Sequence, residues 1–188
     1  NYAEAMKWYR LAAEQGDAVA QFYLGNMYYF DRGVPQDYAE AVKWYRLAAE
    51  QGNALAQFAL GAMYQYGEVV PVNYAEAMKW YRLAAEQGFA DAQYALGTMY
   101  SLGQGVEQDY AEAAKWYLLA ADQGHAEAQF TLGWTYNLGQ GVEQDYAEAV
   151  KWYLLAAEQG HADAQYNLAL MYFDGEGVPV NYAEAVKW

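Results

Sequence analysis

The strongest constraint on this chain is a repeat of 36 residues that runs through the whole sequence. One tyrosine recurs at this interval, at Tyr2, Tyr38, Tyr74, Tyr110, Tyr146 and Tyr182. A tryptophan does the same, at Trp8, Trp44, Trp80, Trp116, Trp152 and Trp188. Self-similarity with a period of roughly 20–50 residues is typical of a solenoid, which grows by adding units and not by enlarging one core. We therefore expect a single solenoid over 1–188, with units near 1–36, 37–72, 73–108, 109–144 and 145–180 and a partial unit at 181–188.

Each unit contains two segments with helical patterns, such as 38–49 and 90–100. Asn1 and Asp37 precede the first segment as expected N-caps, and a glutamate three residues later, such as Glu40, predicts a capping box. A glycine follows each first segment, where a helix often ends in the left-handed conformation. These glycines are Gly16, Gly52, Gly88, Gly124 and Gly160. The pattern predicts an all-α fold of helix-turn-helix units.

The first helix of a unit is apolar on two sides. Ala41, Val42 and Tyr45 share one side of segment 38–49 at about 100° per residue, whereas Trp44 and Leu47 lie on another. Helices of about 13 residues are marginal alone in water, so their stability must come from packing on neighbours. Two apolar sides fit a stack in which one side meets the partner helix and the other meets the next repeat.

The second helix of each unit has an invariant side and a variable one. The invariant side, which we expect to be core, consists of Ala20, Gln21, Leu24, Gly25, Met27 and Tyr28. The remaining positions change from unit to unit, cover one continuous arc, and are rich in aromatic and aliphatic residues. We call this arc the variable face; its candidate partner-binding residues are Val19, Tyr23, Asn26, Tyr29, Phe30, Leu55, Ala62, Gln65, Tyr66, Asp91, Thr98, Ser101, Leu102, Glu127, Thr131, Trp134, Asn137, Leu138, Asp163, Asn167, Leu170 and Phe173.

The motifs A-Q-Y-x-L-G-x-M-Y, G-x-G-V and D-Y-x-E-A-x-K-W-Y-x-x-A-A-x-Q-G resemble those of the Sel1-like repeat family, relatives of tetratricopeptide repeats, over the whole chain. The resemblance implies a right-handed α/α superhelix whose second helices line a concave groove, and a role in protein binding or complex assembly. Three residues depart from the pattern, and we expect slightly different bends at each. Asp31 and Val69 replace loop glycines, and Ala169 replaces the helix glycine.

Composition and charge exclude several functions. The net charge of −14, with 10 Lys and Arg against 24 Asp and Glu, disfavours nucleic acid, which requires a basic surface. No run of apolar residues is long enough to cross a membrane. Cysteine is absent, and the two histidines, His125 and His161, occupy a position just after a glycine that suits an N-cap better than a metal site. We therefore expect no cofactor, no metal and no catalytic residues, and the compartment, periplasmic, secreted or cytoplasmic, stays open.

Two functions remain open from the sequence. The variable face predicts a scaffold that binds a protein or peptide segment in the concave groove, unless its aromatic residues merely pack against neighbouring repeats. The alternative is a structural spacer or a head-to-tail array, because the open end of a solenoid exposes an apolar face that a second copy could cover.

Overall fold

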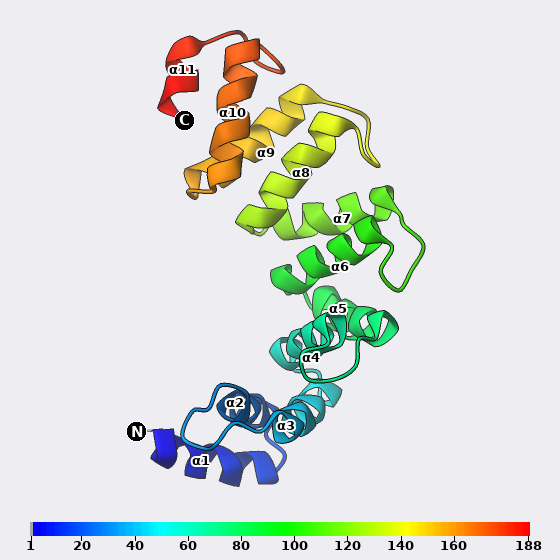
Figure 1. Cartoon of the computed structure of the whole chain (residues 1–188), viewed down its shortest axis with the longest axis vertical. Coiled ribbons are helices and arrows are strands. Elements are labelled where there is room, and N and C mark those ends of the chain that lie inside the picture. The colour runs from blue at the N-terminus through cyan, green and yellow to red at the C-terminus, as the bar shows by residue number, and fades with distance from the viewer. Residues whose placement is uncertain (1) are drawn as a thin grey trace. The chain divides into compact units, whose positions relative to one another are not determined.

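The structure, a computed structural model, describes residues 2–188 and consists of α-helices joined by turns and loops over that range (Figure 1). This confirms the all-α, two-helix repeat, although the N-cap expected at Asn1 lies outside the described residues. Each odd-numbered helix is the first helix of a unit, and each even-numbered helix is the second. The helices are α1 Tyr2–Glu14, α2 Ala18–Tyr29, α3 Tyr38–Glu50, α4 Ala54–Tyr66, α5 Tyr74–Glu86, α6 Ala90–Leu102, α7 Tyr110–Ala121, α8 Ala126–Leu138, α9 Tyr146–Glu158, α10 Ala162–Asp174 and α11 Tyr182–Lys187.

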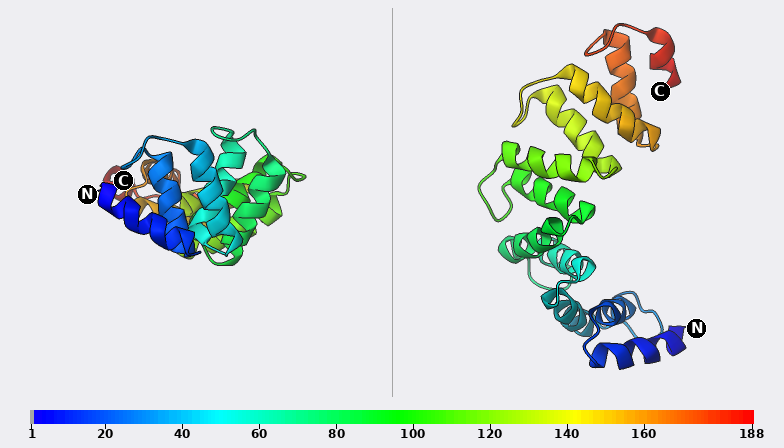
Figure 2. Two further views of the ribbon diagram at one scale, coloured as in Figure 1. Left: turned by 90° about the horizontal axis from the view of Figure 1, so that it is seen from below. Right: turned by 180° about the vertical axis from the view of Figure 1, so that it is seen from behind.

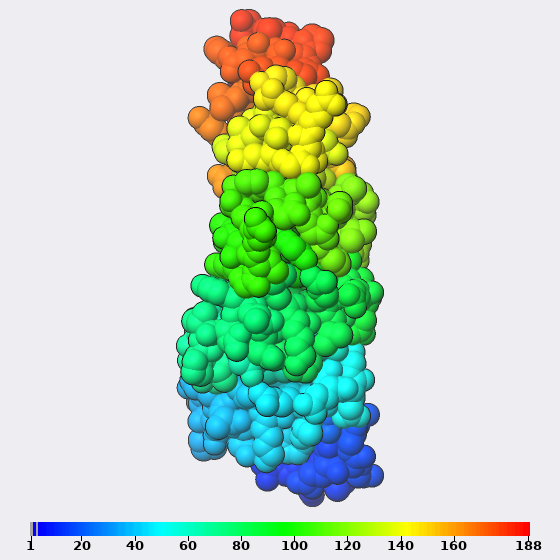
Figure 3. All heavy atoms as spheres, turned by 90° about the vertical axis from the view of Figure 1, so that its right-hand side faces the viewer, coloured from blue at the N-terminus to red at the C-terminus, as the bar shows by residue number. Residues whose placement is uncertain are grey.

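The chain divides into two compact units, Asn1–Ala92 and Gln93–Trp188. Within each unit, consecutive helices run antiparallel and every helix packs on the next along the chain (Figure 2). The space-filling view shows the atoms of successive helices in contact inside each unit (Figure 3). The arrangement is that of a solenoid, in which each repeat obtains its core from its neighbours.

The helix ends follow the sequence signals. The Asp37 carboxylate accepts hydrogen bonds from the backbone N–H groups of Ala39 and Glu40, both at 3.0 Å, and so caps α3. Asn53 caps α4 in the same way. Gly52, between these two helices, has a φ of +89°, the left-handed conformation that a side chain would strain. The expected glycine ends and side-chain N-caps are therefore confirmed.

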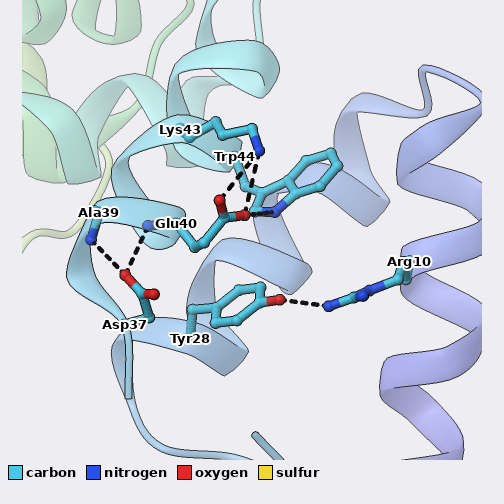
Figure 4. Close-up of polar contacts among 7 residues, drawn as sticks. All are labelled: Arg10, Tyr28, Asp37, Ala39, Glu40, Lys43 and Trp44. Carbon is cyan, nitrogen blue, oxygen red and sulfur yellow. Dashed lines mark hydrogen bonds and ion pairs between the residues drawn. The ribbon is translucent and has the colours of Figure 1, made fainter. Parts of the chain in front are cut away.

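The expected capping box is wrong in its second half, as Figure 4 shows for α3. The Glu40 carboxylate does not return to the backbone N–H of Asp37; it accepts hydrogen bonds from the Lys43 ammonium at 3.1 Å and the Trp44 indole N–H at 3.1 Å. The Asp37 N–H instead donates to the carbonyl oxygen of Tyr28 in α2, at 3.1 Å. The preceding helix satisfies that donor, so the glutamate is free to hold the tryptophan.

The core repeats one contact between helices. A tyrosine in each of α3, α5, α7 and α9 lies over the helix glycine of the preceding helix, as Tyr45 lies over Gly25 and Tyr81 over Gly61. A Cβ atom added to Gly61 would lie 2.5 Å from the Tyr81 ring, closer than atoms can approach. The residues of the invariant side of α2 are buried as expected, except Tyr28, which is half-buried. Glycine is needed there because it allows the tyrosine ring to reach the helix backbone.

Buried glutamines join three successive helices. Gln57 in α4 donates to the carbonyl oxygen of Ala49 in α3 at 3.0 Å, and its own side-chain oxygen accepts a hydrogen bond from Gln87 after α5 at 2.7 Å. The same side-chain pair recurs in the other repeats. We call this series the glutamine ladder; its pairs are Gln21–Gln51, Gln57–Gln87, Gln93–Gln123 and Gln129–Gln159.

The three departures from the repeat pattern differ in their effect on the local structure. Asp31 retains the left-handed conformation of the glycine that it replaces, with a φ of +54°. Val69 does not adopt a positive φ, whereas its equivalent Gly141 has a φ of +75°. A Cβ at Gly141 would lie 2.2 Å from the backbone of Tyr110, so the loop through Val69 must take another path. The third departure, Ala169, leaves α10 continuous from Ala162 to Asp174.

Candidate functional site

Most of the variable face is accessible, as the sequence predicts. Tyr66, Trp134 and Phe173 are 67%, 42% and 57% exposed, and the smaller members between them are exposed or half-buried. Gln65 differs, because the structure places it in the core, where it is 8% exposed. The two compact units each carry their own stretch of this face: α2, α4 and Asp91 in the first unit, and α8, α10 and the α6 residues Thr98, Ser101 and Leu102 in the second.

Several polar members of the variable face bind the core tyrosines. The Tyr45 hydroxyl donates to the Asn26 side-chain oxygen at 2.6 Å, and the Tyr81 hydroxyl donates to that of Gln65 at 2.9 Å. Burial raises the pKa of both tyrosines well above the ordinary value of 10.0. The unit-to-unit variation at these positions therefore includes different ways to satisfy the same buried hydroxyl group.

A hollow of about 330 Å³ lies between α2 and α4 in the first unit, and we call it the α2–α4 pocket. It is of the size at which pockets begin to hold small ligands or single side chains. Its walls combine aromatic rings from both helices and from the following turn with two carboxylates. The lining residues are Phe22, Asn26, Tyr29, Phe30, Tyr45, Leu55, Phe58, Ala59, Ala62, Met63, Tyr66, Glu68, Phe89 and Asp91.

The residues predicted for the variable face include half of those that line this pocket. The lining residues that were not predicted are Phe22, Tyr45, Phe58, Ala59, Met63, Glu68 and Phe89. Phe89 stands out in the sequence, because the equivalent position in the other repeats holds a residue that can cap a helix, such as Asn53. The Phe89 ring packs edge-on against Phe58, with 5.3 Å between the centroids. The position of Phe22 and Phe58 holds either Phe or Tyr in every repeat, and this constant aromatic character predicts a core residue.

Glu68 lies in the rerouted loop that contains Val69. Its carboxylate accepts a hydrogen bond from the Tyr29 hydroxyl at 3.2 Å, which bridges the loop after α4 and the end of α2. Burial and then the negative charge of Glu68 raise the pKa of Tyr29. The carboxylate itself is exposed and lies at the wall of the pocket.

Positive and negative charges lie on different helices. Every Lys and Arg of the chain is on an odd-numbered helix except Arg32, which lies in the loop after α2. The even-numbered helices carry Asp91, Glu127, Asp163 and Asp174 and no basic residue. Glu40 and Lys43 pair at 3.1 Å on α3, and the same pair recurs on α5, α7, α9 and α11. The even-numbered helices of the variable face are therefore acidic and apolar, and the guanidinium of Arg32, in the loop after α2, lies against the Phe30 ring.

The second unit has a smaller apolar hollow of about 240 Å³ between α10 and α11. Tyr166, Phe173 and Val186 border it and are 65%, 57% and 87% exposed. The equivalent of Tyr166 one repeat earlier, Phe130, is half-buried and stacks on His161 at 4.6 Å. In the preceding repeat, the equivalent aromatic ring is therefore covered by a residue of the repeat that follows it.

The two histidines are N-caps, as expected. His125 and His161 accept backbone hydrogen bonds through Nδ1 from Ala128 and Ala164, at 3.1 and 3.3 Å. The other ring nitrogen of His161 contacts the Glu127 carboxylate at 3.0 Å. Within residues 2–188, no three or more His, Cys, Asp or Glu side chains cluster as metal ligands would, and no helix is both long and apolar enough to cross a membrane.

Comparisons with known proteins agree with this arrangement. The Sel1 repeat matches residues 1–17, 18–53, 54–89, 90–125, 126–161 and 162–188. A protective antigen of uropathogenic Escherichia coli strains is similar at 45% identity and a TM-score of 0.96, over 98% of this chain and 40% of that one. A Sel1 repeat protein from Oxalobacter formigenes is 40% identical, with a TM-score of 0.91, over 100% of this chain and 77% of that one.

The cysteine rich protein B of Helicobacter pylori shares the fold at 24% identity and a TM-score of 0.55, over 69% of this chain and 92% of that one. No curated protein matches the chain. The matched repeats start at the second helix of each pair, so a repeat in this register joins α2 to α3 and α4 to α5. The chain spans 40% of the length of the Escherichia coli antigen.

Proposed function

Because this chain belongs to the Sel1 repeat family, whose members generally act as scaffolds for protein–protein interaction, we propose that it binds a peptide or protein segment along its variable face. The observation that carries the proposal is the exposure of Tyr66, Trp134 and Phe173 on that face. Aromatic residues dominate the binding energy of many interfaces. A face that met only water would not need to vary among large apolar side chains.

The geometry supports this function better than catalysis. Two polar side chains of the variable face, Asn26 and Gln65, accept hydrogen bonds from core tyrosines. The titratable groups with the most strongly raised pKa values, including Tyr45 and Tyr81, are buried in the repeat core. A catalytic site would need activated groups that converge on an open cleft. A binding surface needs only apolar anchors and room beside them.

The double variant Tyr66→Ala with Trp134→Ala tests the proposal. Random linear peptides displayed on phage are selected on the wild-type chain, and the affinities of the enriched peptides are measured by fluorescence anisotropy. We expect the double variant to weaken peptide binding by about tenfold or more, since exposed aromatic residues serve as anchors. Its melting temperature should fall by no more than a few degrees, because both side chains are largely exposed.

A matched control removes similar apolar area from the odd-numbered helices. Leu83→Ala with Leu119→Ala truncates two exposed side chains there and should leave peptide binding within about twofold of wild type. If the first double variant loses its fold together with its binding, or if both double variants bind peptides equally, the variable face is not the binding surface.

The second candidate function, a structural spacer or a head-to-tail array, is favoured by one observation. Tyr166 and Val186 leave an apolar surface exposed at α10 and α11. If self-association covers it, light scattering should show a molecular mass that rises with concentration, and Val186→Glu should abolish the rise. A chain that stays monomeric at the highest concentration contradicts self-assembly.

A further inference from the structure

The α2–α4 pocket combines aromatic walls with a carboxylate, and we propose that it receives an arginine side chain from a basic partner segment, with the guanidinium group bound to Glu68. This rests on the proposed function, because the arginine would belong to the segment that lies along the variable face. It goes beyond that function by naming the charge and the anchoring residue of the partner.

The shape of the pocket suits a long side chain with a planar charged end. Tyr29 at the end of α2, Phe30 directly after it, and Phe58 and Tyr66 of α4 line a volume of about 330 Å³. The methylene groups of an arginine can pack against such rings, and its guanidinium plane can stack on an aromatic face. This chain shows the same contact itself, since the Arg32 guanidinium lies 5.0 Å from the centre of the Phe30 ring.

The carboxylate is positioned at the wall by the fold. Glu68 belongs to the loop that Val69 reroutes, and the Tyr29 hydroxyl donates to its Oε2 atom at 3.2 Å. One hydrogen bond leaves further lone pairs on a carboxylate, which has about four acceptor positions. A guanidinium group can fill two of these with parallel N–H bonds, which is stronger and more directional than a bond to a lysine ammonium.

Charge complementarity selects a basic occupant over a neutral or acidic one. Glu68 and Asp91 both line the pocket, and no Lys or Arg does. The basic residues of the first unit lie on the odd-numbered helices apart from Arg32, and the net charge of the chain is −14. An acidic segment would place carboxylates against carboxylates, whereas an arginine places its charge where the pocket is negative.

Phage selection with the intact chain tests the inference, using the same library of random linear peptides. The targets are the wild-type chain, Glu68→Gln and the matched control Glu86→Gln, which removes the same charge from the exposed end of α5. We expect arginine to be enriched at one position on the wild type and on the control, and not on Glu68→Gln. Unchanged circular dichroism melting will show that the exposed Glu68 substitution leaves the fold intact.

A double-mutant cycle then locates the contact. We expect an enriched peptide to lose about tenfold in affinity when its arginine becomes glutamine on the wild-type chain, and less than about twofold on Glu68→Gln. Enrichment of neutral or acidic peptides that still need Tyr66 and Trp134 would overturn the arginine inference and leave the proposed function standing. Arginine peptides that bind Glu68→Gln as well as the wild type would also overturn it. Absence of any peptide that depends on the variable face would overturn both.

Discussion

The same buried tyrosine position has different hydrogen-bond partners in different repeats. Tyr45 donates to Asn26, whereas the hydroxyl of its equivalent Tyr153 is buried without a hydrogen-bond partner among the described residues. The residue equivalent to Asn26 is Trp134, whose indole can donate a hydrogen bond but cannot accept one. The variable face thus exchanges a core hydrogen bond for a large exposed aromatic side chain in that repeat.

The pair Tyr45→Phe and Tyr153→Phe measures this difference. We expect Tyr45→Phe to lower the free energy of unfolding by about 1–2 kcal/mol, because Asn26 loses its donor. Tyr153→Phe should change it by less than about 0.5 kcal/mol or increase it, because the lost hydroxyl has no partner to leave behind. Urea denaturation followed by circular dichroism provides both values. Equal losses in the two variants would mean that the Tyr153 hydroxyl is satisfied in solution.

At the scale of helices, the glutamine ladder links elements that the sequence pattern treats separately. Gln57 holds α3 through the carbonyl oxygen of Ala49 and reaches the end of α5 through Gln87. At the last described repeat, Gln165 binds the carbonyl oxygen of Ala157 at 3.1 Å. No hydrogen bond like that between Gln57 and Gln87 reaches it from a residue within 2–188. Within residues 2–188, the ladder therefore connects three helices at Gln57 and two at Gln165.

When a ladder glutamine is replaced by leucine, the loss of unfolding free energy should be larger where the glutamine connects more helices. We expect Gln57→Leu to cost about 1–3 kcal/mol of unfolding free energy, because it removes two hydrogen bonds in the core. Gln165→Leu should cost about 0.5–1.5 kcal/mol, since it removes one. The midpoints of urea denaturation compare the two. A larger loss for Gln165→Leu would contradict the assignment of the ladder as a link between successive repeats.

Helix existence and type were predictable, because caps, glycines and apolar periodicity act within a few residues of each other. The capping box was not, because the backbone N–H of Asp37 is satisfied by Tyr28 from the preceding helix. That contact depends on how α2 packs on α3. A local motif shows which groups can bond to each other, whereas packing decides which of them do.

For the whole molecule, burial of tyrosines makes stability sensitive to alkaline pH. Burial raises the pKa of Tyr45, Tyr81, Tyr117 and Tyr153 above the ordinary value of 10.0. Above about pH 10, the tyrosines of the unfolded chain ionise, whereas those of the folded core stay protonated. The free energy of unfolding therefore keeps its full value below about pH 10 and falls as the pH rises above it.

Denaturation midpoints measured across this range should fall steeply as the pH rises above about 10. The absorbance of tyrosinate from the buried tyrosines, Tyr45, Tyr81, Tyr117 and Tyr153, should rise only as the chain unfolds. Complete ionisation in one step near pH 10 with the helices intact would show that the core tyrosines are open to solvent.

The sequence by itself determined the repeat, the helix pair, the glycine and N-cap positions and the division between an invariant and a variable side. These follow from short-range steric and hydrogen-bond rules that act identically in every copy. Tertiary structure alone decided which members of the variable face are available. Gln65 is buried against Tyr81, and Glu68 and Phe89 join a pocket with Tyr29, because one rerouted loop and the contacts between repeats bring them together. Such contacts depend on where neighbouring helices place their side chains, and no spacing within one repeat specifies that.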